Sequence, residues 1–202
     1  MTINYYWGIP DASVHFCENK YEKIIYISEF WNTISSFSFI VMGLLLLKYR
    51  EKRICFGLIG IGIGSVLLHM TSRHFGQWID EISMLIVTFI GIQEYKKTIS
   101  SLFLFPTIIL YLLFSKYFIL FFLVFVIANV YIAYRSFVKA CICLSIKQSI
   151  LIYLYLYFLT LGSTCWLLDQ FYCETFINNQ LHAWWHIFTS LAGFCAILAL
   201  FK

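Results

Sequence analysis

The chain has 202 residues, of which 61% are hydrophobic and 12% are charged, and its formal net charge is +4. A soluble domain averages about 45–50% apolar and about 25% charged residues, so the excess apolar surface is expected to face lipid. Disorder is excluded by the aromatic content of 20% and the presence of only two prolines. The positive charge does not indicate nucleic-acid binding, because the basic residues cluster in short loops between apolar stretches.

A helix needs about 20 mostly apolar residues to cross a bilayer. The stretch 99–137 would be about 60 Å long as one helix, so we divide it at Ser115-Lys116. In chain order, the expected spans then lie near 32–49, 54–71, 77–95, 99–114, 117–137, 147–168 and 182–201. The sequence therefore predicts an all-α polytopic membrane protein, a seven-transmembrane-helix bundle. We expect a single domain over 1–202, with an outer N-terminal segment over 1–31.

The loop charges predict the orientation of this bundle. With seven spans, most of the fourteen basic residues fall on one side: Lys48, Arg50, Lys52, Arg53, Lys96, Lys97, Arg135, Lys139, Lys147 and Lys202. Lys and Arg mark the cytosolic face, so the N-terminus is expected outside or in a lumen and the C-terminus in the cytosol. The membrane would be the endoplasmic reticulum or Golgi in a eukaryote, and the cytoplasmic membrane in a bacterium.

Two of the seven cysteines, Cys17 and Cys173, fall in outer polar segments. The outer compartment permits disulfides. We predict a Cys17–Cys173 bridge that ties the N-terminal segment to the loop before the last span. The alternative is two free thiols.

Histidines occur at the outer ends of two expected spans. His182 and His186 are four residues apart at the start of the last span, and Ser65 and His69 are four apart near the end of the second. Residues four apart share one helical face. Three neutral imidazoles from two helices, with one open position, match a catalytic zinc site. The alternative is that these histidines make hydrogen bonds between packed helices.

Carboxyl groups occur at the same expected depth, at the start of the third span. Asp80 and Glu81 lie there, and ionisable groups within a bilayer are costly and usually functional. Glu81 is about 100° round the helix from Asp80, so both cannot face a metal ion. A carboxyl group beside the zinc ligands could orient them or act at the attacking water.

Four motifs that carry these residues occur in a fixed order: Tyr26-Ile-Ser-Glu-Phe-Trp-Asn-Thr-Ile-Ser35, Gly62-Ile-Gly-Ser-Val-Leu-Leu-His-Met70, Gln77-Trp-Ile-Asp-Glu81 and Leu181-His-Ala-Trp-Trp-His186. Together they resemble the alkaline ceramidase family, and the match runs from Trp7 to the C-terminus. The wider superfamily includes adiponectin-receptor-like membrane proteins, whose Ser, His, Asp and paired His residues are similar to those in these motifs.

The resemblance implies a zinc-dependent intramembrane amidase that hydrolyses ceramide to sphingosine and a free fatty acid. His69, His182 and His186 would hold the zinc. Asp80 would move protons as a general acid and base, and Ser65 would stabilise the developing oxyanion. The partners implied are a ceramide-like substrate and membrane lipid. We expect no nucleic acid and no obligate protein partner.

The resemblance also implies an N-terminal calcium site, in a pattern Asp-Trp-Cys-Glu-Glu-Asn followed by a later Glu. Cys17, Glu18 and Glu29 match this pattern, whereas His15 and Lys20 replace the aspartate and the asparagine. Calcium needs several oxygen ligands, and an ammonium group is a poor neighbour for it. Either the calcium site is weakened or Lys20 substitutes for the charge of the ion.

Other functions remain open to this sequence. A hydrolase of the same fold could act on another lipid amide or on an ester. A heptahelical receptor with structural zinc belongs to a different class. A long cytosolic N-terminal domain would favour a receptor, whereas the N-terminal segment here is short and expected on the opposite side, which disfavours it. A transporter would be expected to show inverted repeats with broken helices, and we find none in the sequence.

Overall fold

The structure is a computed structural model that describes residues 5–142 and 144–201. Three parts of the chain lie outside the described residues: 1–4 of the expected outer segment, Cys143, and Lys202, which was counted among the basic residues of the cytosolic side. The described part of the chain is helical and contains no β-strand, and its single β-bridge pairs Ile24 with Ile27. The all-α prediction is therefore confirmed for these residues.

The helices follow the expected spans closely. In chain order they are α1 (Phe30–Leu46), α2 (Lys52–Thr71), α3 (His74–Tyr95), η1 (Ser101–Phe103), α4 (Leu104–Phe114), α5 (Phe118–Ile142), α6 (Ile146–Phe171), α7 (Cys173–Phe176), η2 (Ile177–Asn179) and α8 (Leu181–Leu200). Five of them, α2, α3, α5, α6 and α8, are long and apolar enough to cross a membrane. The helical segments Phe30–Leu46 and Ser101–Phe114 are shorter and also apolar.

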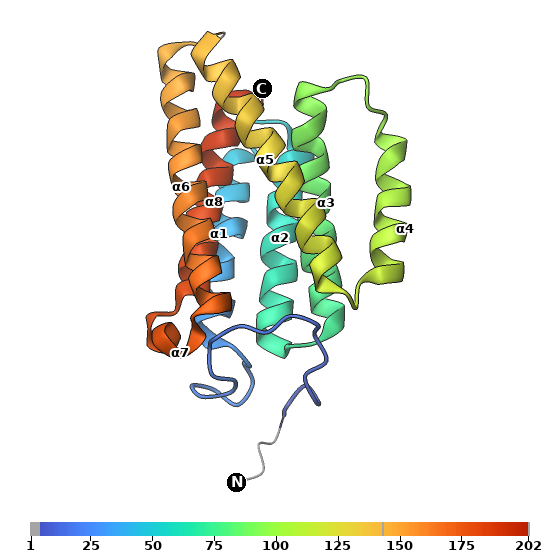
Figure 1. Cartoon of the computed structure of the whole chain (residues 1–202), viewed down its shortest axis with the longest axis vertical. Helices are drawn as coiled ribbons and strands as arrows, with labels where there is room; N and C mark the ends of the chain where they lie inside the picture. Colours follow the sequence, from blue (N-terminus) through green and yellow to red (C-terminus); the bar gives the residue numbers. More distant parts are fainter. Residues whose placement is uncertain (1–4, 143, 202) are drawn as a thin grey trace.

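The long helices run side by side along the long axis of the molecule (Figure 1). α1 packs against both α2 and α8, α6 packs along α8, and α3 packs along α2. α5 crosses the bundle diagonally and contacts α3 and α6, and α4 lies at the edge against α3 (Figure 1). The N-terminal segment folds across one end of the bundle, opposite the end at which α8 finishes (Figure 1).

Local sequence explains how α2 and α3 are placed. Ser72 ends α2 in the left-handed region, with φ of 52°, and the chain turns directly into α3. A Cβ atom at Gly64 would overlap the backbone nitrogen and Cα of Asp80. Because glycine has no side chain, the backbones of α2 and α3 can approach closely at this level. The contact places Asp80 beside the helix that carries Ser65 and His69.

The ends of the bundle differ in polarity. The largest apolar cluster includes Leu46 at the end of α1, Ile54 at the start of α2 and Ile197 near the end of α8. The opposite end contains buried polar side chains, among them Glu29 and His69. Burial of apolar side chains therefore stabilises one end, and the polar groups gather at the end covered by the N-terminal segment.

A disulfide joins Cys17 to Cys173, with their Cα atoms 5.3 Å apart. This bond confirms the predicted bridge. The expected loop before α8 contains the short helices α7 and η2 rather than irregular chain. The backbone nitrogen of Cys17 also donates a hydrogen bond to Oδ2 of Asp169, at 3.4 Å. The N-terminal segment is thus fixed both to the end of α6 and to α7.

Candidate metal centre

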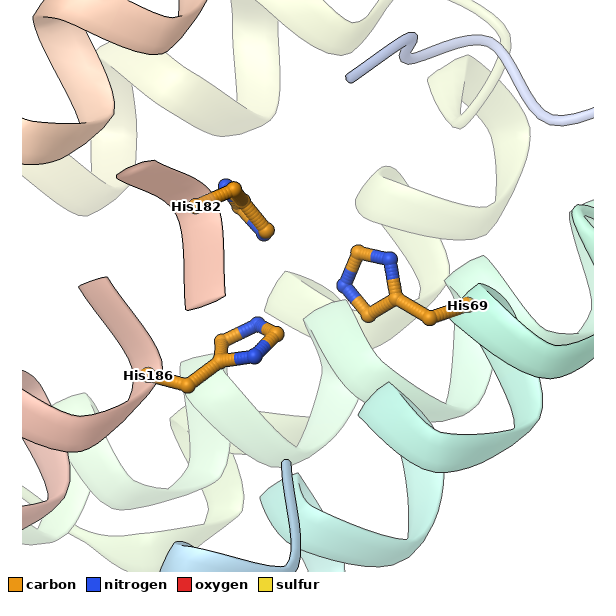
Figure 2. A group of neighbouring side chains, drawn as sticks. All are labelled: His69, His182 and His186. Atoms are coloured by element: carbon orange, nitrogen blue, oxygen red, sulfur yellow. The ribbon is translucent and has the colours of Figure 1, made fainter. Parts of the chain in front are cut away.

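Three buried histidines converge at the polar end of the bundle. His69 comes from α2, whereas His182 and His186 come from the first two turns of α8, and their rings point toward one another (Figure 2). The ring centroids lie 4.6 to 5.0 Å apart, and the side chains expose 1 to 4% of their surface. One nitrogen from each lies within 4.8 Å of the others. The cluster could hold a metal ion.

The hydrogen bond of His69 fixes which of its nitrogens is free. Nδ1 lies 2.6 Å from Oε2 of Glu29, a residue that is 2% exposed. A carboxylate accepts, so Nδ1 carries the hydrogen and donates it. The Nε2 atom of His69 is buried and has no partner among the described residues. The lone pair of Nε2 is therefore available to a cation.

His186 is oriented in the same way by the first turns of α1. Its Nδ1 lies 2.8 Å from Oγ of Ser35, and Ser35 donates its hydroxyl hydrogen to the carbonyl oxygen of Asn32 at 3.1 Å. In the tautomer in which Ser35 accepts from Nδ1, the lone pair of the ring is on Nε2. That Nε2 lies 3.3 Å from Oγ of Ser65. Nε2 of His186 therefore faces the hydroxyl of Ser65, and His69 and His186 belong to the same cluster.

The ring nitrogens of these three histidines are suitable ligands for a zinc ion. Zinc in proteins is bound by imidazole nitrogens, and catalytic sites commonly offer three protein ligands and an open position. Metal-binding histidines usually donate their second ring hydrogen to a carboxylate or another oxygen, as His69 and His186 do here. The Nδ1 atom of His182 is also buried and has no hydrogen-bond partner among the described residues, so its lone pair too is available to a cation.

Ser65 and Asp80 lie on the wall of a cavity of about 430 Å³ that also reaches His182 and His186. Ser65 Oγ is 2.9 Å from Oγ of Ser36 on α1. The Oδ1 atom of Asp80 is buried and has no partner within the described part of the chain. The structure thus brings both predicted catalytic residues to the cavity that contains two of the predicted metal ligands.

The cavity extends along the bundle, away from the histidines. Its far end is lined by Ile54, Tyr95 and Phe201, near the opposite ends of α2, α3 and α8. At about 1.5 Å per residue, the stretch of α8 from His186 to Leu200 covers about 21 Å. Between these ends the walls are mostly aliphatic and aromatic side chains from α3, α5, α6 and α8. The cavity can therefore take a long hydrocarbon chain.

Glu18 and Glu29, the predicted calcium ligands, lie close together but have other partners. The carboxylate of Glu18 accepts hydrogen bonds from the backbone nitrogens of Trp31 and Asn32, at 2.6 and 2.9 Å, and so caps the start of α1. Burial raises the pKa of Glu29 to about 7, whereas the Lys20 ammonium, 3.9 Å from its Oε1, opposes that rise. The two alternatives, a weakened calcium site and a Lys20 that replaces the charge of the ion, stay predictions.

Several residues of the site were not predicted from the sequence. Asn32, Ser35 and Ser36 form a polar face on α1, and they contact Glu29, His186 and each other. Their spacing of three and four residues at the start of an apolar stretch is a signal that could have identified them. Phe16, from the N-terminal segment, packs on the rings of both His69 and His182. No sequence pattern indicated this contact.

Comparison with known proteins places the chain in a family. The sequence matches the ceramidase family over residues 8–201. It is 30% identical to an alkaline ceramidase of Arabidopsis thaliana, in an alignment that covers 96% of this chain and 84% of the relative. It is 26% identical to alkaline ceramidase 3 of Mus musculus, with the same coverage of both chains. The chain therefore belongs to the ceramidase family.

Proposed function

We propose that this protein is an intramembrane amidase that hydrolyses ceramide to sphingosine and a free fatty acid. Zinc would be held by His69, His182 and His186, and Asp80 and Ser65 would act on the substrate. The observation that carries the proposal is the convergence of three buried imidazoles, two of which, those of His182 and His186, line a long apolar cavity. The family and the names of the relatives point to ceramide as the substrate.

The cavity supports a lipid substrate. Its far part has the length and the apolar walls that one hydrocarbon chain requires, and its near part has the polar groups that an amide requires. Binding pockets for apolar ligands commonly combine apolar walls with a few polar groups that fix the orientation. A lipid in this position would have its amide beside the histidines and a chain in the cavity.

Uncatalysed hydrolysis of ceramide is slow because an amide is a poor electrophile and water is a poor nucleophile. When bound, zinc supplies a Lewis acid that polarises the carbonyl and makes water a usable nucleophile near neutral pH. Asp80 would accept the proton of the attacking water and later deliver a proton to the nitrogen of the leaving amine. Ser65 would donate its hydroxyl hydrogen to the oxygen that becomes negative in the transition state.

The proposal includes the arrangement in the membrane. A single domain of seven spans, with the outer end at Glu29, His69 and His182, would hold the site within the outer half of the bilayer. The distribution of Lys and Arg between the two ends supports this orientation. Ceramide could then enter laterally, with its chains already in hydrocarbon.

A substrate panel tests the reaction directly. The full chain, purified in detergent and loaded with zinc, would be assayed with ceramide, with the matching ester and with an N-acyl amino acid. Ceramide should be hydrolysed with the highest kcat/KM, and sphingosine and fatty acid should appear in equal amounts. Hydrolysis of the ester alone would support the alternative of a lipid esterase. No hydrolysis of any lipid by zinc-loaded protein would contradict an enzymatic role.

A further inference from the structure

The N-terminal segment supplies one wall of the cavity, at the end of the bundle where the histidines lie. The segment crosses this end (Figure 1), and two of its residues, Val14 and Phe16, line the cavity. Val14 is 6% exposed and belongs to one apolar cluster with Leu68 of α2. We call Val14 and Phe16 the end wall. The opposite end of the cavity is lined by Ile54 and Tyr95.

Phe16 lies directly against two of the proposed metal ligands. Its ring centroid is 4.0 Å from that of His182 and 4.7 Å from that of His69. The ring planes are tilted by 38° and 56°, so the phenyl ring packs across both imidazoles. Substrate atoms that extend from the histidines toward the N-terminal segment therefore meet the ring of Phe16.

Contacts on both sides of Phe16 hold the end wall in place. The backbone nitrogen of Ser13 donates to the side-chain oxygen of Gln77 on α3, and the side-chain nitrogen of Gln77 donates to Oγ of Ser13, both at 2.7 Å. On the other side, the disulfide joins Cys17 to Cys173 at the start of α7. The end wall is thus attached to α3 and to α7, and it cannot move aside without breaking these bonds.

The position of the end wall matters for one part of a sphingolipid. A head group is attached to the oxygen on the carbon next to the amide-bearing carbon. In a bilayer this head group lies at the membrane surface, outside the hydrocarbon core that holds both chains. With the amide at the histidines and a chain in the far part of the cavity, the head group points toward the N-terminal segment. It therefore meets the end wall.

The end wall is unfavourable for a large head group in two ways. Protein interiors are closely packed, so additional atoms there force neighbouring side chains out of position. The side chains of Val14 and Phe16 also offer no hydrogen-bond donor or acceptor, so the hydroxyl groups of a sugar or the oxygens of a phosphate would lose water without compensation. A free hydroxyl is the smallest head group of a sphingolipid and meets the smallest penalty.

We propose that Phe16 is a specificity-determining residue, which restricts hydrolysis to sphingolipids whose head-group oxygen is unsubstituted. A sugar or a phosphocholine on that oxygen would overlap the end wall and keep the amide away from the metal ligands. This inference rests on the proposed hydrolysis of ceramide in the outer half of the bilayer. It adds the class of ceramide derivatives that the site excludes, and it names the side chain that excludes them.

The test compares lipids that differ only at the head-group oxygen. The zinc-loaded full chain would be assayed with ceramide, 1-O-methylceramide and glucosylceramide. We expect kcat/KM for the methyl ether to be about 5- to 100-fold below that for ceramide, the range for one small group forced into a closely packed site. Glucosylceramide should not be hydrolysed measurably. Phe16→Ala removes a side chain much larger than a methyl group, so it should abolish most of the preference for ceramide over the methyl ether.

Two further variants separate the end wall from the rest of the cavity. Phe125→Ala makes the same change on α5, elsewhere on the cavity wall, and should keep the native preference for ceramide. Phe16→Leu keeps apolar packing on the imidazoles and should give an intermediate preference. It also tests the inference if Phe16→Ala does not fold. Zinc content, measured in each sample, shows whether a variant has damaged the metal centre.

The ratio of the two rates decides the outcome. Equal losses on ceramide and the methyl ether in the Phe16 variants would show that Phe16 only supports the histidines, and this result would overturn the inference. A native protein that hydrolyses the methyl ether as fast as ceramide would overturn it as well, and would leave ceramide hydrolysis standing. Failure of the native protein to hydrolyse ceramide at all would instead overturn the proposed function.

Discussion

His69 donates its Nδ1 hydrogen to the carboxylate of Glu29 across 2.6 Å, in a contact buried from solvent on both sides. Glu29 precedes α1, and its backbone nitrogen donates to the carbonyl oxygen of His69 at 2.9 Å. The two residues are therefore joined by side chains and by backbone. This double link makes the junction of the N-terminal segment and α1 part of the candidate metal centre rather than a cover over it.

The first prediction concerns Glu29→Gln. An amide is a weaker acceptor than a carboxylate, so the ring of His69 would be oriented less firmly and its Nε2 would be less basic. We expect zinc affinity to fall by about 10- to 100-fold. Competition with a chelator of known affinity measures the change. Glu22→Gln, at an exposed carboxylate paired with Asn19 and Lys23, is the matched control and should bind zinc normally. Equal affinities in the two variants would refute the role of Glu29.

The second prediction concerns calcium and Lys20. The Lys20 ammonium lies 3.9 Å from Glu29, and the carboxylate of Glu18 is already bonded to the start of α1. We therefore expect added calcium to change hydrolysis less than about 2-fold, because a hard cation needs several free oxygen ligands. Lys20→Asn removes the ammonium and restores an oxygen, so it should make activity respond to calcium. A strong calcium response of the native protein would show that Lys20 does not replace the ion.

The third prediction concerns the disulfide between Cys17 and Cys173. It holds the segment that carries Phe16 and Glu18, and loss of a native disulfide typically costs about 2–5 kcal/mol. The paired variant Cys17→Ser/Cys173→Ser should therefore unfold at a lower temperature and lose zinc affinity. Cys141→Ser, at an exposed free thiol on the other end of the bundle, serves as the control. An unchanged melting temperature in the paired variant would contradict this account.

The fourth prediction concerns the close approach of α2 and α3. A Cβ at Gly64 would overlap the backbone of Asp80, so Gly64→Ala should push the helices apart and cost about 1–3 kcal/mol. Hydrolysis should fall further than stability alone explains, because Asp80 would move away from Ser65. At Gly60 a Cβ would meet only the side chain of Ser83, with Oγ at 3.0 Å and Cβ at 3.5 Å, so Gly60→Ala is a milder control. Identical losses in both variants would argue against a specific effect at Asp80.

The sequence predicted the parts of the site that follow from helical spacing. His182 and His186 share a face because they are four residues apart. The alternating direction of the expected spans placed His69 at the same depth. The disulfide was predicted from the compartment of its two cysteines. The positions of the helices were also predicted within a few residues, because apolar length is a strong signal in a membrane protein.

The parts that were missed depend on how the chain folds back on itself. Glu29 was interpreted as a calcium ligand, and its bond to His69 depends on the path of the segment before α1. Asp80 and Glu81 do point in different directions around the helix axis, as predicted. That prediction did not show that one cavity is wide enough to reach both side chains. Such contacts join residues distant in the sequence, and local periodicity carries no information on them.

The most direct test measures zinc content and ceramide hydrolysis in the same purified samples of the native protein, His182→Ala and His186→Ala. The native protein should contain about one zinc ion per chain, lose activity when a chelator removes it and regain activity with added zinc, as a three-histidine catalytic site requires. Both variants should lose zinc and hydrolysis together. Full hydrolysis of ceramide by a variant that contains no zinc would contradict the account.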